Sequence, residues 1–359
     1  MVVWFSMQEA IFLQTCRRQP TPYTPVWLMR QAGRYMPEYR ALREKVPFLT
    51  LCKSPDLAAQ VTVEAVERLG VDAAIIFADI LLIVEPMGVG LEFSKSDGPV
   101  IHRPVRSGAD VDRLVEGRPA DTVPFVFAAV RKARESLPAH IPLIGFSGAP
   151  FTVASYLIEG GSSRHYIETK RLMYQDPGAW QALMERLVRV IAAYVNGQVA
   201  AGAQAVQLFD SWVGCLSPAD YRAFILPHMK ALIQSLTPGT PVIHFGTETA
   251  GLLELLAEAG GDVIGVDWRV DLDVAWRRIG MNRAVQGNLD PVALFASRDE
   301  LRRQVERILQ SVAGRPGHIF NLGHGILPQT PVDNVIALVD MVHEMSAKIV
   351  SSSKFQVPG

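Results

Sequence analysis

Short apolar runs alternate with helical patterns along almost the whole chain of 359 residues, and this alternation limits the fold more than any other feature. Most runs are continuously apolar, which is typical of strands buried on both faces of a parallel sheet. About eight strand–helix repeats favour a (β/α)8 TIM barrel of the α/β class. A doubly wound open sheet is the alternative, and periodicity alone does not separate the two. The predicted strands span residues 25–29 (the weakest), 73–77, 142–146, 205–209, 241–245, 263–267, 284–288 and 318–322.

The helical pattern is clearest at residues 176–202. Asp176 is placed to cap the helix, Pro177 occupies its first position and Gly202 stands near its end. This order of residues is typical of helix boundaries. Similar patterns occupy residues 54–70 (with Ser54 as cap, Pro55 next and Gly70 closing), 251–261 and 299–314.

One stretch interrupts the alternation. Residues 87–105 contain glycine and Asp-Gly turn signals between strand-like pieces, so we expect a small hairpin inserted after the second repeat. We therefore predict a single barrel domain at residues 25–348. An N-terminal extension with a helix precedes it at residues 1–24, and a disordered tail follows at residues 349–359.

The composition favours a globular protein and argues against several partners. Hydrophobic residues make up 49% of the chain and charged residues 20%, which is enough for a buried core. The formal charge is −1, so the chain lacks the basic balance of a non-specific nucleic-acid binder. Cys16, Cys52 and Cys215 stand alone, without a C-x-x-C pair, which argues against a disulfide framework and favours a reducing, cytoplasmic setting.

The sequence contains no segment that we expect to span a membrane. The first residues are apolar, but no basic region precedes them and Glu9 interrupts the run, so a signal peptide is not expected. Met7 is an alternative start to Met1. The densest apolar run, residues 73–84, carries Asp79 and is too short to cross a bilayer.

Polar residues follow the predicted strands. In a barrel, the C-terminal ends of the strands meet at one face, where the chemistry takes place. Asp79 is the only charge in residues 73–84, and its burial is costly unless cations or donors meet it. A local capping role is the alternative for Asp79 and for Asp210. The strand-end residues are Arg30, Asp79, Ser147, Gly148, Asp210, Ser211, His244, Asp267, Asn288, Asp290, Gly323 and His324.

An arginine cluster follows the first predicted strand. Arg30 and Arg34 are four residues apart, and Gly33 interrupts any helix between them. Like charges at this spacing repel each other, so an anionic ligand is expected to neutralise them. Arg43 is a weaker member of the same cluster. No metal site is expected, because His244 and His324 lie on different strands and no H-E-x-x-H motif occurs.

Three loops add further candidates. Residues 145–163 hold small residues that let a ligand approach the backbone, and Tyr156 falls on the following helix. Ordinary packing is the alternative for this tyrosine. Ser211 lies in a Phe-Asp-Ser run that lacks the G-x-S-x-G elbow of a nucleophilic serine. His324 stands between two glycines, which expose its ring.

Taken together, these segments resemble the uroporphyrinogen decarboxylase family. The resemblance runs from about Pro25 to about Met341 and rests on "PVWLMRQAGRYMPEYR", "FADIL", "GFSGAPFTVASYLIEGGSS", "QLFDSWVG" and "NLGHGILPQTP". It implies a (β/α)8 barrel, a homodimer and no cofactor. It also implies a step of haem biosynthesis, in which the four acetate side chains of uroporphyrinogen III become methyl groups, coproporphyrinogen III forms and carbon dioxide leaves.

The resemblance also implies functional residues. Asp79 would accept hydrogen bonds from the pyrrole N–H groups and stabilise the cationic ring that forms during decarboxylation. Arg30 is a candidate proton relay, with Tyr156 or a water as alternatives. Rim carboxylates would be bound by arginines, by backbone N–H groups of the turn and by Ser211 and His324. The implied substrate-binding residues are Arg30, Gln31, Ala32, Gly33, Arg34, Asp79, Tyr156, Ser211 and His324.

Two rival functions remain. A zinc-dependent, corrinoid-linked methyltransferase would share the barrel, but it needs a His-x-Cys zinc motif, and this chain has Gly246 at the position of the cysteine. A non-catalytic binder of tetrapyrroles or organic anions could use the same arginines. Asp79 distinguishes a decarboxylase from such a binder, because an anion binder gains nothing from a carboxylate in its site.

Overall fold

Seven of the predicted strands form one parallel sheet whose order follows the sequence. The computed structural model describes residues 9–94 and 98–353 of the chain. The strands pair in the order β1-β4-β5-β6-β7-β8-β9, and every pair is parallel. Their bounds are β1 Ala74–Ile75, β4 Leu143–Gly148, β5 Ala205–Asp210, β6 Val242–Gly246, β7 Val263–Gly265, β8 Ala284–Gln286 and β9 His318–Ile319.

The remaining predicted strand, residues 25–29, closes the sheet. The amide of Phe320 donates to the carbonyl of Pro25 at 2.9 Å, and the amide of Trp27 donates back to Phe320 at 3.4 Å. On the other side, the amide of Asp72, just before β1, donates to the carbonyl of Val26 at 2.7 Å. The segment 25–29 therefore bridges the two edges of the sheet, although it forms only an isolated β-bridge.

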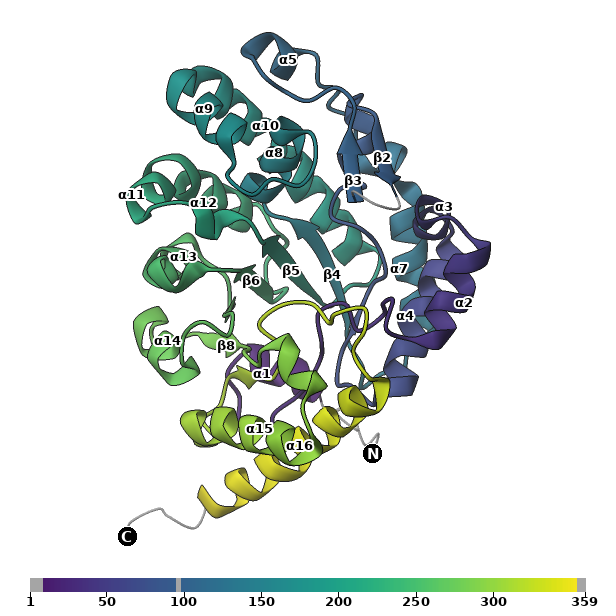
Figure 1. Ribbon diagram of the computed structural model, residues 1–359, viewed down its shortest axis with the longest axis vertical. Coiled ribbons are helices and arrows are strands. Elements are labelled where there is room, and N and C mark those ends of the chain that lie inside the picture. The colour runs from purple at the N-terminus through teal and green to yellow at the C-terminus, as the bar shows by residue number, and fades with distance from the viewer. Residues whose placement is uncertain (1–8, 95–97, 354–359) are drawn as a thin grey trace, which may run out of the picture.

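Eight helices of the described chain form a closed ring, and Figure 1 shows them arranged around the strands. Along this ring each helix contacts the next, and the last contacts the first. A doubly wound sheet would leave two open edges, so the protein is a (β/α)8 barrel. The ring consists of α4 Pro55–Leu69, α7 Pro124–Ser136, α10 Pro177–Ala200, α12 Leu226–Gln234, α13 Leu253–Ala259, α14 Leu272–Ile279, α15 Arg298–Val312 and α16 Val332–Ser353.

Shorter elements occupy the loops between strands and ring helices. The α-helices are α1 Ile11–Cys16, α2 Pro37–Lys45, α3 Phe48–Lys53, α5 Gly108–Asp112, α6 Pro119–Thr122, α8 Pro150–Glu159, α9 Ile167–Gln175 and α11 Pro218–Asp220. The 3-10 turns are η1 Glu85–Met87, η2 Val213–Cys215, η4 Thr249–Gly251 and η5 Pro291–Phe295, and η3 Tyr221–Ile225 is a π-helical turn.

The boundaries of the longest helices follow the capping pattern in the sequence. In α10 the side chain of Asp176 accepts a hydrogen bond from the amide of Ala179 at 2.9 Å, which confirms the predicted cap. Helix α4 ends at Gly70, which has a left-handed φ of 68°. Ser54 occupies the N-cap position of α4, but its side chain makes no capping hydrogen bond there.

The interior of the barrel contains a chain of buried polar side chains. Trp27 Nε1 donates to Gln286 Oε1 at 2.8 Å, and Gln286 Nε2 donates to Gln207 Oε1 at 3.0 Å. These residues come from the closing segment, β8 and β5, which are not neighbours in the sheet. All three are buried. Their bonds therefore cross the centre of the barrel and identify the inward face of each strand.

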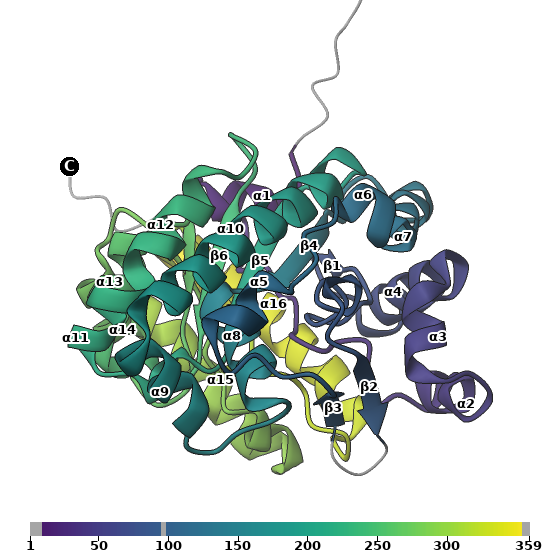
Figure 2. The same cartoon turned by 90° about the horizontal axis from the view of Figure 1, so that it is seen from above.

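The predicted hairpin is present. Strands β2 Leu91–Ser94 and β3 Gly98–Ile101 are antiparallel. The amide of Ile101 donates to the carbonyl of Gly160 at the end of α8 at 2.8 Å, and the Phe93 ring lies 4.9 Å from the Phe48 ring of α3. Figure 1 draws the hairpin beside α3, and Figure 2 shows it on the side of the molecule that carries α2 and α3. Asp97, which belongs to the predicted Asp-Gly turn signal, lies outside the described residues.

The two ends of the described chain pack against the barrel. Helix α1 contacts β9, and Arg17 Nη2 donates to the carbonyl of Gly239, just before β6, at 3.3 Å. The question of Met1 or Met7 as the start lies outside the described residues. The boundary predicted for a disordered tail at residue 349 is wrong, because α16 continues to Ser353. Ser351 Oγ bonds to the carbonyl of Ala347 at 2.8 Å, which is compatible with a helical serine.

Within the described residues, the structure contains no helix whose length and apolar character would let it cross a membrane.

Candidate active site

Most of the predicted site residues follow the C-terminal ends of the strands, at the face of the barrel that we call the mouth. Arg30 follows the closing segment, Asp79 follows β1, Ser211 follows β5 and His324 follows β9. Tyr156 lies on α8, directly after β4. The parallel direction of the strands is what brings these five distant positions to one face.

Arg30 is fixed by the loop that carries His324. Its backbone is left-handed, with a φ of 61°, which is uncommon for a residue with a side chain. A Cβ at Gly325 would lie 2.5 Å from Arg30 Cδ, so the side chain of Arg30 runs across this glycine. The amide of Ile326 donates to the carbonyl of Met29 at 3.0 Å and joins the two loops. The guanidinium of Arg30 has no ion-pair partner within residues 9–94 and 98–353.

The side chain of Gln31 is bonded within the protein. Its side chain is buried, accepts a hydrogen bond from the amide of Leu28 at 3.1 Å and donates one to the carbonyl of Ala73 at 3.1 Å. The side chain therefore joins the turn to the start of β1 instead of facing the mouth. The amides of Ala32 and Gly33 have no acceptor in the described parts of the chain. These two groups are the donors that the turn can offer to a ligand.

The other arginines of the cluster are not equivalent. Arg34 is exposed, and no carboxylate of the described residues pairs with it. Arg40 Nη1 donates to the carbonyl of Tyr35 at 2.8 Å and so holds the turn. Arg43 donates to the carbonyl of Val46 and stacks on Phe48. Arg43 is thus occupied by its own helix end, whereas Arg34 is available.

Asp79 lies in a loop after β1 and is partly buried. Its Oδ1 accepts a hydrogen bond from the amide of Leu81 at 2.8 Å, which closes a local turn. No helix of the described chain begins directly after Asp79, so this bond is not the helix cap that we considered. Burial raises the pKa of Asp79 to about 6, while the bond from Leu81 and the charge of Arg30 oppose this rise. The carboxylate therefore lies close enough to Arg30 for the two charges to interact.

Tyr156 and Ser211 lie on the β4 and β5 side of the mouth. Burial, and after it the charge of Asp79, raises the pKa of Tyr156 to about 12, so this hydroxyl keeps its proton at neutral pH. The Tyr156 ring packs edge-on against Trp212 at 5.7 Å, next to Ser211. Ser211 Oγ has no hydrogen-bond partner among residues 9–94 and 98–353.

His324 feels the charges of two cations. Burial lowers the pKa of His324 to about 4, and the charges of Arg30 and Arg269 lower it further, whereas Asp267 opposes them. The ring is therefore neutral at neutral pH. A neutral imidazole still donates one hydrogen bond, so His324 can bind a carboxylate without carrying a charge.

An aromatic layer covers the barrel interior below these residues. Phe209 lies two residues after Gln207 and so shares its inward face. The ring of Phe209 packs edge-on against Phe146 at 5.5 Å and against Phe245 at 6.0 Å. The mouth therefore has an apolar floor and a polar wall, an arrangement typical of small-molecule sites.

Three strand-end residues that we expected at the mouth face the opposite way. Asp210, Ser147 and His244 each follow or precede an inward phenylalanine by one residue, which turns their side chains toward the helices. Asp210 is buried and accepts from Thr152 Oγ1 of α8 at 3.0 Å, and burial raises its pKa to about 7. His244 is buried without a hydrogen-bond partner in the described chain, and burial lowers its pKa to about 4.

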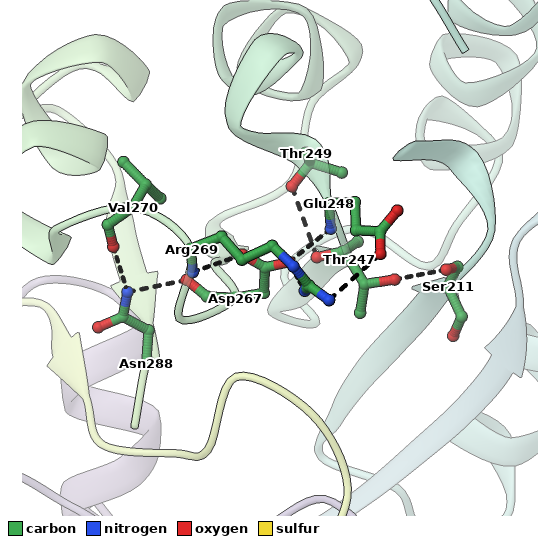
Figure 3. Close-up of polar contacts among 9 residues, drawn as sticks. Ser211, Thr247, Glu248, Thr249, Asp267, Arg269, Val270 and Asn288 are labelled. Atoms are coloured by element: carbon green, nitrogen blue, oxygen red, sulfur yellow. Dashed lines mark hydrogen bonds and ion pairs between the residues drawn. The ribbon is translucent and has the colours of Figure 1, made fainter. Parts of the chain in front are cut away.

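Two other strand-end residues support the backbone. Asn288 Nδ2 donates to the carbonyl of Asp267 at 2.8 Å and to that of Val270 at 2.7 Å (Figure 3). Asp290 caps η5 by accepting from the amide of Val292 at 2.9 Å. Both side chains therefore shape the loops at the mouth.

A further cation at the mouth was missed. Arg269 follows β7 and pairs with Asp267 at 2.7 Å and with Glu248 at 3.2 Å (Figure 3). Its position two residues after the predicted strand at 263–267 was a usable signal, but the sequence reasoning considered only the arginines near residue 30. The loop that carries His324 contacts the loops of both arginines, because a Cβ at Gly323 would lie 2.5 Å from the amide nitrogen of Trp268 and a Cβ at Gly325 would lie 2.5 Å from Arg30 Cδ.

The family of the chain follows from comparison with known proteins. A model of the family described as "Uroporphyrinogen decarboxylase (URO-D)" matches residues 7–345. The chain belongs to the uroporphyrinogen decarboxylase family. A uroporphyrinogen decarboxylase of Carboxydothermus hydrogenoformans is 56% identical over 94% of this chain and 96% of its own. One of Sorangium cellulosum is 57% identical over 93% of this chain and 96% of its own.

The barrel also resembles a solved structure outside this identity range. A methyltransferase from Methanosarcina mazei superposes with a TM-score of 0.79 and 21% identity, over 93% of this chain and 97% of that one. This likeness supports the fold of the uroporphyrinogen decarboxylase family and nothing about its chemistry.

The zinc-dependent rival meets a steric obstacle in this chain. A Cβ at Gly246 would lie 2.7 Å from Thr249 Cγ2, so the cysteine that a His-x-Cys site needs does not fit without a shift. In addition, His244 points away from the mouth. Among the described residues, no group of three or more His, Cys, Asp or Glu side chains could hold a metal ion.

Proposed function

We propose that this chain decarboxylates the four acetate side chains of uroporphyrinogen III to give coproporphyrinogen III and carbon dioxide, a step of haem biosynthesis. The family and the relatives named above support this activity. The observation that carries it is the partly buried carboxylate of Asp79 at the mouth, within electrostatic reach of the unpaired Arg30. A macrocycle with N–H donors at its centre and carboxylates at its rim matches such a site.

Asp79 is assigned to the centre of the macrocycle, where one carboxylate can accept hydrogen bonds from several pyrrole N–H groups. Protonation of a pyrrole ring carbon creates a cationic, iminium-like ring. The bond between the acetate methylene and its carboxylate then breaks, and the electron pair moves into this ring. Carbon dioxide leaves, the methylene carbon takes a proton to become methyl, and the ring carbon gives its proton back. Asp79 would stabilise the cationic stage, and losing such a group commonly costs about 3–4 kcal/mol in the barrier.

The rim carboxylates are assigned to groups that are free to donate. Arg30 and Arg34 supply charged donors, the amides of Ala32 and Gly33 add backbone donors, and Ser211 and His324 add neutral ones. Gln31 is assigned a positioning role, because both ends of its amide are already bonded.

Proton delivery is assigned to Arg30, with Tyr156 or a water as alternatives. Arg30 would hold the reacting acetate, and Tyr156 keeps its proton at neutral pH because its pKa is raised to about 12. The variants Arg30→Lys and Tyr156→Phe separate the two side chains, since only loss of the true donor would lower kcat without a matching rise in KM. The substrate provides its own electron sink, so the proposed reaction uses no cofactor.

The same proposal includes a homodimer and a cytoplasmic location. Free Cys16, Cys52 and Cys215 are compatible with a reducing compartment. Analytical ultracentrifugation would test the dimer, and a single species at 39.4 kDa would contradict it.

The decisive experiment is incubation with anaerobically reduced uroporphyrin III, followed by chromatography for products with seven to four carboxylates. We expect stepwise loss with the wild-type chain and almost none with Asp79→Asn, which should stay folded. Full activity of Asp79→Asn would disprove the mechanism. Tight binding of the macrocycle by the wild type without any loss of carboxylates would favour the non-catalytic anion binder instead.

A further inference from the structure

Arg269 is held by Asp267 and Trp268 and makes one further contact, with Glu248. Its Nη1 donates to Asp267 Oδ2 at 2.7 Å, and its backbone amide donates to Asp267 Oδ1 at 3.0 Å. The guanidinium also stacks on Trp268, with 4.1 Å between its carbon and the ring centre. A second guanidinium nitrogen, Nη2, donates to Glu248 Oε1 at 3.2 Å (Figure 3).

The two partners of Arg269 differ sharply in exposure. The side chain of Asp267 is 1% exposed, whereas that of Glu248 is 61% exposed. Asp267 also accepts from the amide of Glu248, so it is fully used by fixed donors. Buried ion pairs in which further hydrogen bonds satisfy the carboxylate are costly to break, while exposed pairs contribute little. The inner contact of Arg269 is therefore permanent and the outer one is exchangeable.

Glu248 can release Arg269 without a change in the backbone. Its φ of 60° is left-handed, and its amide is bonded to Asp267, which fixes the main chain at this position. A Cβ at Gly214 would lie 2.5 Å from Glu248 Cβ, so this neighbour also limits the main chain. Only the side chain beyond Cβ is free to rotate, and in the described structure its carboxylate has Arg269 as its one ion-pair partner.

The place of Arg269 at the mouth gives this exchange a purpose. The loop that carries His324 contacts the loops of both arginines: a Cβ at Gly323 would lie 2.5 Å from the amide nitrogen of Trp268, next to Arg269, and a Cβ at Gly325 would lie 2.5 Å from Arg30 Cδ. The charges of both arginines accordingly act on His324. A ligand with several carboxylates that engages Arg30 and His324 would bring a second carboxylate toward Arg269.

We propose that Arg269 binds a substrate carboxylate on the β7 side of the mouth, and that Glu248 occupies this position when no ligand is bound. This inference rests on the proposed function for the identity of the ligand. Asp267 and Trp268 keep the guanidinium in place, so that binding of the ligand replaces one carboxylate by another. Glu248 thereby acts as an internal competitor that favours polycarboxylate ligands over ligands with few charges.

Three variants test the exchange. We expect Arg269→Gln to raise KM for reduced uroporphyrin III about tenfold, as loss of a charge-assisted hydrogen bond predicts. We expect Glu248→Gln to lower KM, because the competitor is weakened, and kcat to stay within about twofold in both. Arg278→Gln is the matched control, since Arg278 makes a two-pronged pair with Glu254 on the outer helices at 2.7 and 2.8 Å. It should leave KM unchanged.

A structural ion pair would behave differently. If Arg269 only held the loop, Arg269→Gln and Glu248→Gln would change KM in the same direction or not at all, and either result would overturn the proposal. Should Arg269→Gln fail to fold because Asp267 loses its partner, Glu248→Gln alone decides the question. An unchanged or higher KM in that folded variant refutes the exchange.

A binding assay with oxidised uroporphyrin III, measured by the quenching of its fluorescence, separates this inference from the proposed function. A wild-type chain that binds the porphyrin but releases no carbon dioxide from the reduced form would disprove the decarboxylase. The exchange would then be judged by binding alone, with tighter binding by Glu248→Gln and weaker binding by Arg269→Gln as its signature. Equal binding by both variants would overturn it.

Discussion

Arg30 and Gly325 are in direct contact: an added Cβ at residue 325 would lie 2.5 Å from Cδ and 2.8 Å from Cγ of Arg30. The contact joins two loops that are almost 300 positions apart in the sequence. It means that the orientation of the arginine depends on the absence of a side chain in the His324 loop.

Substitution Gly325→Ala should displace Arg30 while the barrel stays folded. No left-handed φ is recorded for Gly325, so the new methyl group acts on its neighbour and not on its own backbone. We expect kcat/KM for reduced uroporphyrin to fall by about 10- to 100-fold, because small displacements of a positioning group are costly. Gly251→Ala is the control, since an added Cβ there meets open space. Equal activity of both variants would refute the positioning role.

Activity should have an acidic limb near pH 6. The pKa of Asp79 is raised from 3.8 to about 6, mainly by burial, so the carboxylate becomes protonated as the pH falls through this value. The ionised form is the one that stabilises a cationic ring, and kcat/KM should therefore decline below about pH 6. Because the charge of Arg30 lowers the pKa of Asp79, Arg30→Gln should move the limb to higher pH. A limb that stays in place would show that another group titrates.

Substitution Gln31→Ala should affect stability through two lost hydrogen bonds. Both polar ends of this buried side chain have backbone partners, and their loss should lower the free energy of unfolding by about 2–4 kcal/mol. Gln60→Ala is the control, since Gln60 bonds only to Glu64 on an exposed helix face. Urea denaturation measures both. A Gln31 variant of unchanged stability with a much higher KM would restore a direct contact with substrate.

Substitution Asp210→Asn should stabilise the protein, and more so at high pH. Burial raises the pKa of Asp210 from 3.8 to about 7, so in the wild type the ionised form is unfavourable in the folded state. Wild-type stability is therefore lost as the pH rises from about 4 to about 7, and the variant escapes this loss. The gain in unfolding free energy should be about 1–3 kcal/mol larger at pH 8 than at pH 5. The exposed Asp340→Asn should show no such difference.

The order of the fold was readable from the sequence because each strand is a local apolar run. All seven sheet strands overlap predicted runs, although β1 keeps only Ala74–Ile75 of its run. The segment 25–29 was the weakest prediction, and its pairing depends on partners at Asp72 and Phe320, which no local pattern contains. The extent of α16 was underestimated because three serines at residues 351–353 resemble a loop.

The site was predicted less completely, because the direction in which a side chain points depends on the assembled sheet. Asp210 follows the predicted strand at residues 205–209 and His244 lies within the one at 241–245, but a shift of one residue turns a side chain from the mouth to the helices. Gln31 looked like part of a ligand turn until its partners, Leu28 and Ala73, were known. Arg269 was overlooked because its partner Glu248 lies in the loop after β6 and reaches it only through space.

The hydrogen-bonded chain of Trp27, Gln286 and Gln207 also limits how a substrate can enter and leave the barrel. These side chains fill the barrel axis at mid-height and are completely enclosed, so nothing the size of a pyrrole passes from one end to the other. Substrate and product therefore enter and leave through the same mouth. A macrocycle with four acetate groups must then rotate at the mouth, or dissociate and bind again, between one decarboxylation and the next.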